Sequence, residues 1–245
     1  MAATEILHIV TLRRVRYGDS RSIVTAWSRE RGRLSLVVST GAGRTAARTR
    51  AMLLTPSLLE CRVAVTPGRE LLPASGLRPL APLLSLHGHP VKAMVASLVA
   101  ELFDGAVAEV QTPDEAMSDF IEASMLLLDS LDNERAVANF HLYFIWQLAT
   151  LLGIEPDVST WRPGSVFDMS EGRFRQTMPL SGETLTADEA RFVTLMPRLT
   201  PLTLSRLRLT RTQRRRALDL MLGYLSIHGG VTRRLKSLEI MRSLF

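Results

Sequence analysis

Short runs of apolar residues, broken by turn residues, fill the first third of the chain. They cover residues 6–15, 22–27, 34–38, 52–65 and 70–74. Residues 17–20 and 29–32 and the pair Pro67 and Gly68 have the composition of turns between strands. Pro56 favours a bulge or an edge position in the fourth run, since proline cannot donate to a sheet. Five short strands with turn residues between them predict a small closed or nearly closed β-barrel.

From Pro82 onward the apolar residues recur every three or four positions, which predicts helices. The predicted helices cover residues 91–110, 113–131, 134–152, 186–195, 210–226 and 236–245. Thr112 is the expected N-cap of the second helix, with Pro113 at its first position. The third helix is apolar nearly all round, which is typical of the central helix of a bundle, and Gly153 is its stop signal.

Strands followed by helices predict an α+β protein in which an N-terminal β-barrel precedes an all-α helical domain. The expected domains are residues 1–80 and 81–245. Within the second, residues 154–182 form a loop-rich insert with few periodic positions. A chain of 245 residues is long enough to bury a sizeable core.

Charge is distributed unevenly along the chain. Residues 1–80 hold 13 arginines, no lysine and five acidic residues, a net charge of +8. Residues 81–200 have a net charge of −10, and residues 201–245 again have +8. Two basic ends around an acidic middle indicate surfaces that neutralise a polyanion. Arginines scattered over solvated faces are the alternative.

Candidate contacts for a polyanion concentrate at the predicted turns. Arginines end the first strand, flank the second hairpin, and populate a Gly-rich loop that starts at Gly41. A third group follows Gly229 and Gly230. The candidates are Arg13, Arg14, Arg16, Tyr17, Arg29, Arg31, Arg33, Arg44, Arg48, Arg50, Arg233, Arg234 and Lys236. Arginine suits bidentate contacts to phosphate, and Tyr17 and Trp27 are available to stack on bases.

Two of these features have a second interpretation. Trp27 fits a core position as well as a stacking position. The arginines at 211, 214, 215 and 216 lie at a predicted helix start. Three interpretations of this cluster stay open: a contact with nucleic acid, a contact with an acidic protein, and a solvated helix face.

Motifs for catalysis are absent. The chain has no phosphate-binding loop of the nucleotide-hydrolase type, no nucleophile elbow and no complete dinucleotide fingerprint. The single cysteine, Cys61, excludes an internal disulfide and reads as a buried structural thiol. His87 and His89 have no further ligand at metal-binding spacing. We therefore predict a non-enzymatic protein without cofactor or metal, and no apolar run is long enough for a membrane span.

Several local motifs occur in the order found in one known family. They are EILHIV at 5–10, YGDS at 17–20, RGRL at 31–34, GAGR at 41–44 with Arg48, and a terminus with Tyr224, His228, two glycines and KSL at 236–238. Together they resemble the RecO family of bacterial recombination mediators. The resemblance covers essentially the whole chain.

The resemblance implies an N-terminal OB-fold followed by a helical domain. It also implies binding of single- and double-stranded DNA and annealing of complementary strands. The implied partners are RecR and the acidic tail of the single-stranded DNA-binding protein (SSB), together with which the family loads recombinase on SSB-coated DNA. By this analogy the arginine clusters of the barrel are the DNA surface, and the protein is cytoplasmic and associated with the nucleoid.

One departure concerns zinc. Many members of that family carry a four-cysteine zinc motif after a segment that matches LLGIEPD at 151–157. Here Ser159, Trp161 and Pro163 follow, and no cysteine does. The zinc module is therefore lost or replaced, and we expect apolar packing through Trp161 and Phe167 in its place.

The leading hypothesis is a DNA repair mediator that binds and anneals DNA by neutralising phosphate charge. Two alternatives stay open. An RNA-binding OB module fits the same basic grooves, because base stacking does not distinguish the sugars well. A protein-interaction adaptor whose basic ends bind acidic partner tails also fits the charge pattern.

Overall fold

The computed structural model describes residues 3–110, 112–178, 184–230 and 235–244. The chain divides into two compact units. Unit 1 comprises Met1–Ser130 and Leu235–Ser237, and unit 2 comprises Leu131–Arg234 and Leu238–Phe245. The change from strands to helices comes after Ala81, so unit 1 contains helices as well as strands. A separate folding domain of residues 1–80 stays a prediction.

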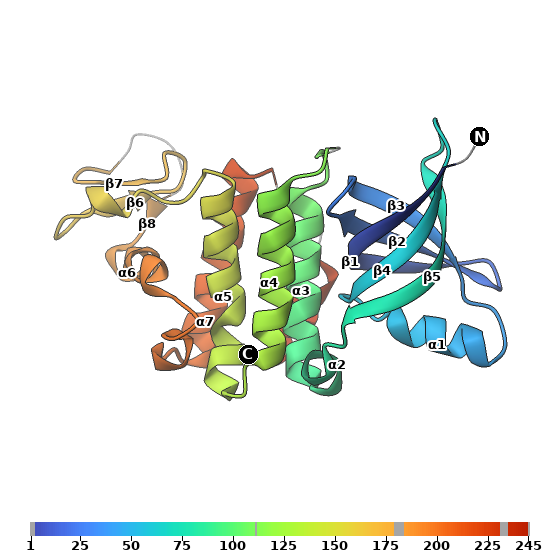
Figure 1. Ribbon diagram of the computed structural model, residues 1–245. Coiled ribbons are helices and arrows are strands. Elements are labelled where there is room, and N and C mark those ends of the chain that lie inside the picture. Colours follow the sequence, from blue (N-terminus) through green and yellow to red (C-terminus); the bar gives the residue numbers. More distant parts are fainter. Residues whose placement is uncertain (1–2, 111, 179–183, 231–234, 245) are drawn as a thin grey trace. The chain divides into compact units, whose positions relative to one another are not determined.

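Five strands in unit 1 close into a barrel (Figure 1). The strands are β1 (Ala3–Tyr17), β2 (Arg21–Ser28), β3 (Gly32–Ser39), β4 (Leu58–Val65) and β5 (Leu71–Ala81). Their order is β1-β2-β3-β5-β4, with β1 pairing β4 to close the barrel and β3 running parallel to β5. With a helix between β3 and β4, this is the arrangement of an OB-fold, and the predicted barrel is confirmed.

Alternation along the strands builds the barrel core. Val24 and Ala26 of β2 and Leu36 and Val38 of β3 point into a cluster of buried aliphatic side chains that also holds Cys61. Gly32 at the start of β3 has φ +69°, and a Cβ there would lie 2.7 Å from the carbonyl oxygen of Thr112. The β2–β3 turn therefore needs glycine for its backbone conformation and for its close contact with the helical part of unit 1.

The predicted Gly-rich loop is in part a helix. Residues Arg44–Met52 form α1, and only residues 40–43 are irregular. The segment is rich in alanine and arginine, which have high helix propensity, so the prediction of a loop through Arg50 was wrong. The fourth strand begins at Leu58 rather than at Met52, and Pro56 lies before it, in the connection from α1.

Three helices complete unit 1: α2 (Leu84–Gly88), α3 (Pro90–Ala106) and α4 (Glu115–Ser130). Helix α4 starts two residues later than expected. The Asp114 side chain accepts a hydrogen bond from the backbone NH of Met117, so Asp114 and not Thr112 caps the helix.

Trp27 joins the barrel to these helices. It lies on β2 between the inward-pointing positions, so its indole is on the outer face of the barrel, yet it is only 1% exposed. The ring packs edge-on against Phe103 of α3, with 5.7 Å between the ring centroids, and Nε1 donates to Ser118 Oγ of α4 at 2.9 Å. Trp27 is therefore a packing residue and not a stacking platform for bases.

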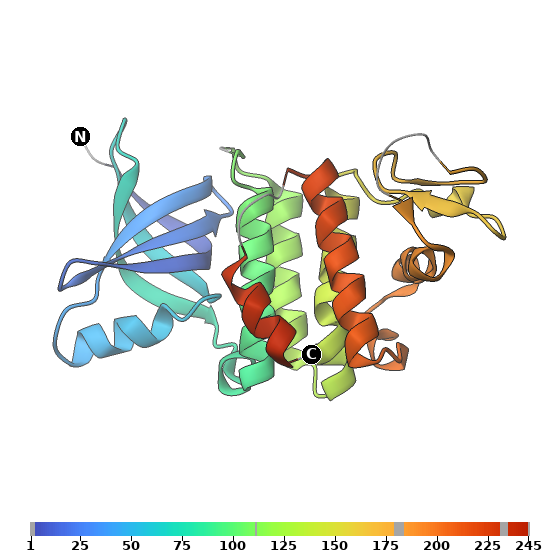
Figure 2. The same ribbon diagram turned by 180° about the vertical axis from the view of Figure 1, so that it is seen from behind.

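Unit 2 contains α5 (Glu134–Leu151), α6 (Ala187–Leu195), α7 (Arg211–His228) and most of α8 (Lys236–Leu244). Helix α5 buries residues on all sides, as its sequence predicts, and Gly153 ends it with φ +68°. Helix α7 lies along α5 (Figure 2). Short 3-10 turns occupy Val158–Thr160, Met196–Arg198 and Leu204–Arg206.

The predicted insert has a small core of its own. Strands β6 (Val166–Asp168), β7 (Arg173–Arg175) and β8 (Thr184–Leu185) form a three-stranded sheet. Phe167 is fully buried there against Phe174 and Tyr224. Trp161 is 45% exposed, so the expectation that it packs in this core was wrong, while the expectation for Phe167 is confirmed. Among the described residues no helix is long and apolar enough to cross a membrane.

Because Trp27 fills the contact between β2 and helices α3 and α4, we expect Trp27→Ala to lower the free energy of unfolding of unit 1 by about 3–5 kcal/mol. Tyr17→Ala removes an aromatic ring that is half exposed at the end of β1, and it should cost less than about 1 kcal/mol. Urea denaturation followed by circular dichroism measures both. Equal losses for the two variants would contradict the role given to Trp27.

Candidate nucleic-acid interface

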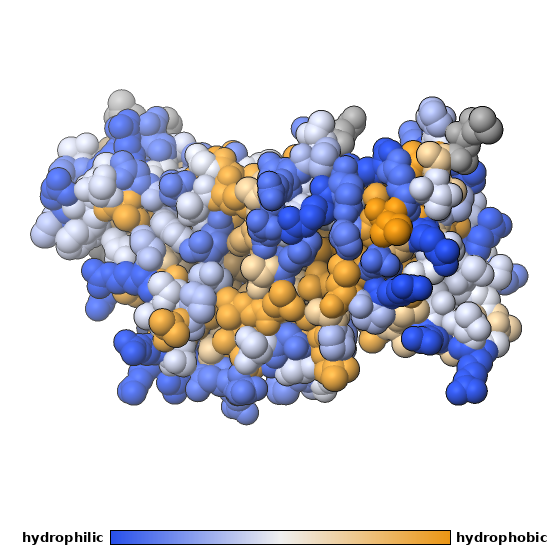
Figure 3. Space-filling model, in the orientation of Figure 1, coloured by the Kyte–Doolittle hydropathy of each residue, from blue (hydrophilic) through white to orange (hydrophobic). Residues whose placement is uncertain are grey.

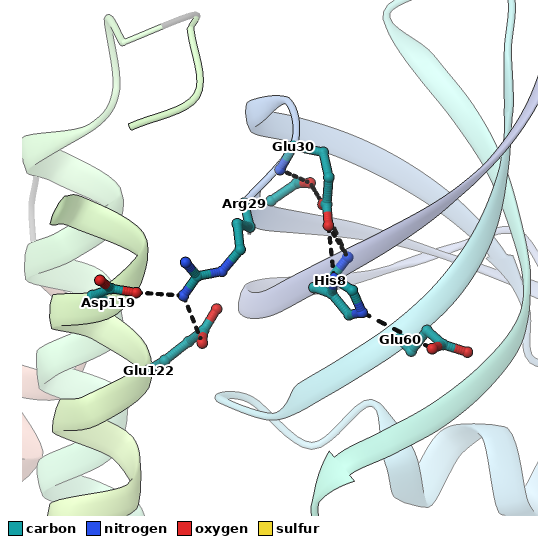
Figure 4. A network of polar contacts seen from close by, with 7 residues as sticks. His8, Arg29, Glu30, Glu60, Asp119 and Glu122 are labelled. Carbon is teal, nitrogen blue, oxygen red and sulfur yellow. Dashed lines mark hydrogen bonds and ion pairs between the residues drawn. The ribbon is translucent and has the colours of Figure 1, made fainter. Parts of the chain in front are cut away.

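Three of the candidate arginines are paired with carboxylates inside unit 1. Arg29, in the β2–β3 turn, reaches α4, where its Nη2 lies 2.6 Å from Asp119 and 3.0 Å from Glu122 (Figure 4). Arg33 Nε lies 2.8 Å from Asp104 of α3, whose side chain is only 9% exposed. Arg31 forms a two-pronged contact with Glu5 of β1 at 2.5 and 2.6 Å. These guanidinium groups already have anionic partners.

A network of acidic residues continues from this turn along the outside of the barrel (Figure 4). Glu30 accepts hydrogen bonds from the backbone NH of His8 and from Ser28 Oγ, and its Oε1 lies 2.7 Å from His8 Nδ1. On its other side, His8 Nε2 is 3.9 Å from Glu60 of β4. Burial raises the pKa of Glu30, but the hydrogen bonds from Ser28 and His8 outweigh it and leave this pKa below its ordinary value. This side of the barrel is unsuited to phosphate.

Three further candidates hold loops together. Arg14 of β1 donates to Ser22 Oγ and to the carbonyl oxygen of Arg50. Arg50, at the end of α1, donates in turn to the carbonyl oxygens of Thr40 and Gly41. Arg16 donates to the Gly18 carbonyl and pairs with Asp19. The side chains of Arg16 and Asp19 are both highly exposed. Arg14 and Arg50 thus join the β1–β2 hairpin to α1.

Tyr17 stays accessible at the tip of the β1–β2 hairpin. Its ring is 48% exposed, and the guanidinium carbon of Arg21 lies 5.6 Å from the ring centroid. This leaves part of the ring free to stack on a base, with a cation beside it.

Besides Arg21, whose guanidinium group lies beside the Tyr17 ring, six exposed arginines of the barrel have no hydrogen bond or ion pair within the described residues. They are Arg13, Arg44, Arg48, Arg62, Arg69 and Arg78. The sequence candidates include the first three. The other three were missed, because they stand singly in β4, in the β4–β5 turn and in β5, and the cluster pattern that marked the candidates does not find isolated arginines. In Figure 3, strongly hydrophilic side chains project from α1 and the barrel surface next to it.

The basic residues of the C-terminal third are divided in the same way. Arg214 donates to Asn139 Oδ1 and to the Leu209 carbonyl, and Arg216 binds Glu189 of α6. Arg215 of α7 is exposed, and Lys236, the first residue of α8, is exposed as well. Arg233 and Arg234 lie outside the described residues. At least half of the cluster at 211–216 therefore stabilises unit 2.

The three residues weighed in the sequence for catalysis or metal binding have structural contacts. Cys61 is buried in the barrel core, where burial raises its pKa to about 12, so the thiol is a poor nucleophile. His89 caps α3 by accepting from the Lys92 backbone NH, and His87 lies 3.3 Å from Ser57 Oγ. In the described part of the chain, no three His, Cys, Asp or Glu side chains are grouped so that they could hold a metal ion.

Comparison with known proteins identifies the family. Residues 87–239 match the family model described as "Recombination protein O C terminal". The chain belongs to the RecO family. It is 29% identical to the DNA repair protein RecO of Phocaeicola vulgatus over 236 residues, which is 96% of this chain and 97% of the relative. It is 30% identical to that of Porphyromonas gingivalis over 246 residues, with the same coverage, and 26% identical to that of Bacteroides fragilis over 241 residues, 98% of this chain and 96% of that one.

The resemblance seen in the sequence motifs is thus confirmed over nearly the whole length. RecO proteins are recombination mediators and not enzymes, in agreement with the lack of catalytic motifs. The chain is a DNA repair and recombination protein of this family.

We expect Glu30 to make stability depend on pH in the acid range. Its folded-state pKa lies below the ordinary value of 4.5, so its contribution is present above about pH 4.5 and is lost as pH falls through the lower folded-state pKa. Glu30→Gln should therefore lose less stability than the wild-type protein when the pH is lowered from 6 to about 3. Urea midpoints at several pH values measure the difference. Glu70→Gln, at an exposed turn position, is the control and should follow the wild-type curve.

Proposed function

We propose that this RecO protein binds single- and double-stranded DNA through the exposed arginines of its barrel and anneals complementary strands. The observation that carries the proposal is the division of the barrel arginines. One group is paired with carboxylates, and a second group, on the β1–β2 hairpin, α1 and β4–β5, is exposed without a partner among the described residues.

Unpaired arginines suit phosphate because no existing ion pair has to be broken when DNA binds. Each guanidinium offers several N–H donors in a plane that matches two phosphate oxygens. Binding releases the counterions condensed on the DNA, so affinity falls as salt rises. A surface that holds two strands lowers the repulsion between their phosphates, and annealing by this route requires no nucleotide hydrolysis.

The partners proposed for this chain follow from its family. RecO family membership supports action together with a RecR-type protein on DNA coated by SSB. The acidic, apolar tail of SSB is the proposed contact for the helical part of the chain. No residue of this chain is assigned to either contact.

The test is annealing of two complementary labelled oligonucleotides by the purified protein, without ATP or metal, over a series of salt concentrations. We expect acceleration that fades with salt. The double variant Arg13→Gln/Arg44→Gln removes two unpaired charges. Each phosphate contact with a single strand contributes about 0.7 to the slope of log affinity against log salt concentration. The affinity of the double variant for single-stranded DNA should therefore fall about sevenfold less between 50 and 200 mM salt than that of the wild-type protein.

The matched control is Arg29→Gln/Arg31→Gln, which changes the charge by the same amount at two paired positions. It should keep the wild-type salt dependence, although it lowers the stability of the barrel. Equal effects of the two double variants would mean that net charge and not the unpaired surface determines binding. Lack of DNA binding at low salt would contradict the proposed function, and matched RNA oligonucleotides show whether the chain prefers DNA.

A further inference from the structure

A groove of about 550 Å³ lies between α1 and β5. Its volume lies within the range of about 300–1,000 Å³ that is usual for ligand-binding clefts. Three arginines line it, each from a different element: Arg48 from α1, Arg62 from β4 and Arg78 from β5. All three belong to the exposed group that has no partner among the described residues.

Arg62 reaches the groove because Gly76 leaves space for it. A Cβ at position 76 would lie 2.8 Å from Nε and 2.9 Å from Nη2 of Arg62, so the guanidinium group lies directly against the backbone of β5. Gly76 also has φ +63°, a conformation that side chains disfavour. Because Gly76 has no side chain, the guanidinium group of Arg62 can lie at the wall of the groove.

The start of α1 adds partial positive charge. The first helical hydrogen bond of α1 runs from Ala47 NH to the Gly43 carbonyl, so the NH groups of residues 44–46 have no acceptor within the helix. Gly43 supplies no side-chain cap, and the first turn holds no acidic residue. Thr45 and Ala46 of this turn line the groove. A helix N-terminus beside three guanidinium groups favours an anion.

The groove also lacks two kinds of side chain. Among the described residues, its lining includes no aspartate or glutamate, which would repel phosphate, and no aromatic ring on which a base could stack. They do include the hydroxyl groups of Ser39, Thr45, Thr49 and Ser75, which can donate to phosphate oxygens. This composition suits a sugar–phosphate backbone better than nucleobases.

We propose that the groove between α1 and β5 holds the backbone of one DNA strand, with Arg48, Arg62 and Arg78 on its phosphates and the bases turned outward. The inference rests on the proposed DNA-binding function and adds to it a defined track for a single strand. A strand held in this way keeps its Watson–Crick edges free to pair with a second strand, and that is the geometry that annealing needs.

The first test compares salt dependence of binding to a labelled oligothymidine. The triple variant Arg48→Gln/Arg62→Gln/Arg78→Gln should reduce the salt slope by about 2 units, so its affinity falls about 20-fold less than that of the wild-type protein between 50 and 200 mM salt. Arg31→Gln, at a position that is paired with Glu5 and does not line the groove, is the control for a loss of charge and should change the slope by less than half a unit.

The second test does not depend on affinity. Cys61 is buried, so Ser75→Cys introduces an accessible thiol in the groove and Thr66→Cys introduces one in the exposed turn outside it. Saturating oligothymidine should slow modification of the thiol at position 75 by at least about tenfold and leave that at position 66 unchanged. Circular dichroism confirms that both variants are folded.

The outcomes separate the inference from the function on which it rests. If the wild-type protein binds DNA but the triple variant has the same salt slope, the groove is not the strand track and the proposed function stays intact. The same holds if the wild-type protein binds DNA but the thiol at position 75 is not protected. A wild-type protein that binds no DNA would overturn both. Loss of binding to an acidic peptide, with DNA binding retained in the triple variant, would assign the groove to a protein tail and contradict the proposal.

Discussion

The packing of Trp27 against α3 and α4 is the contact on which the rest of unit 1 depends. The indole occupies an outward position of β2 that would be in solvent if the barrel stood alone, and only the two helices bury it. Around this apolar contact lie the ion pairs of Arg29 with α4 and of Arg33 with α3. The partly exposed pair of Arg29 contributes little, and the more buried pair of Arg33 with Asp104 has to offset the cost of removing both charges from water. The ring and its hydrogen bond therefore supply most of the stabilisation, and the charges fix the orientation.

This contact also determines which arginines are available. The acidic residues that the sequence concentrates in its middle include Asp104, Asp119 and Glu122, and in the structure they neutralise the β2–β3 side of the barrel. The net charge of +8 in residues 1–80 is therefore not spread evenly over the barrel. The arginines left without acidic partners among the described residues are Arg13 of β1, Arg44 and Arg48 of α1, and the exposed arginines of β4, β5 and the turn between them. Under the proposed function, a polyanion binds where this intramolecular neutralisation is absent.

The sequence predicted much of the fold because periodicity reports burial. The apolar runs between turns in β2 and β3 and the all-round apolar face of α5 gave correct elements, since each reflects which side chains enter a core. Helix α1 was missed because none of its residues is buried, so its sequence carries no apolar stripe and only its propensity indicated a helix. Trp161 was misplaced for a related reason: residue type alone does not tell a core aromatic from an exposed one. Pairing between residues far apart in sequence, such as Arg29 with Asp119, leaves no local pattern.

The exclusive use of arginine in residues 1–80 has one physical explanation for both groups. A guanidinium group is planar and weakly hydrated, so it can form a two-pronged contact with a carboxylate, as Arg31 does with Glu5, or lie flat against backbone, as Arg62 does at Gly76. Lysine, a strongly hydrated point charge on a flexible stem, would do neither as well. The same side chain thus stabilises the barrel where a carboxylate faces it and is available to phosphate where none does. Whether an arginine is structural or free to bind is determined by its neighbours in space, and for Arg29 and Arg33 those neighbours lie on the helices against which Trp27 packs.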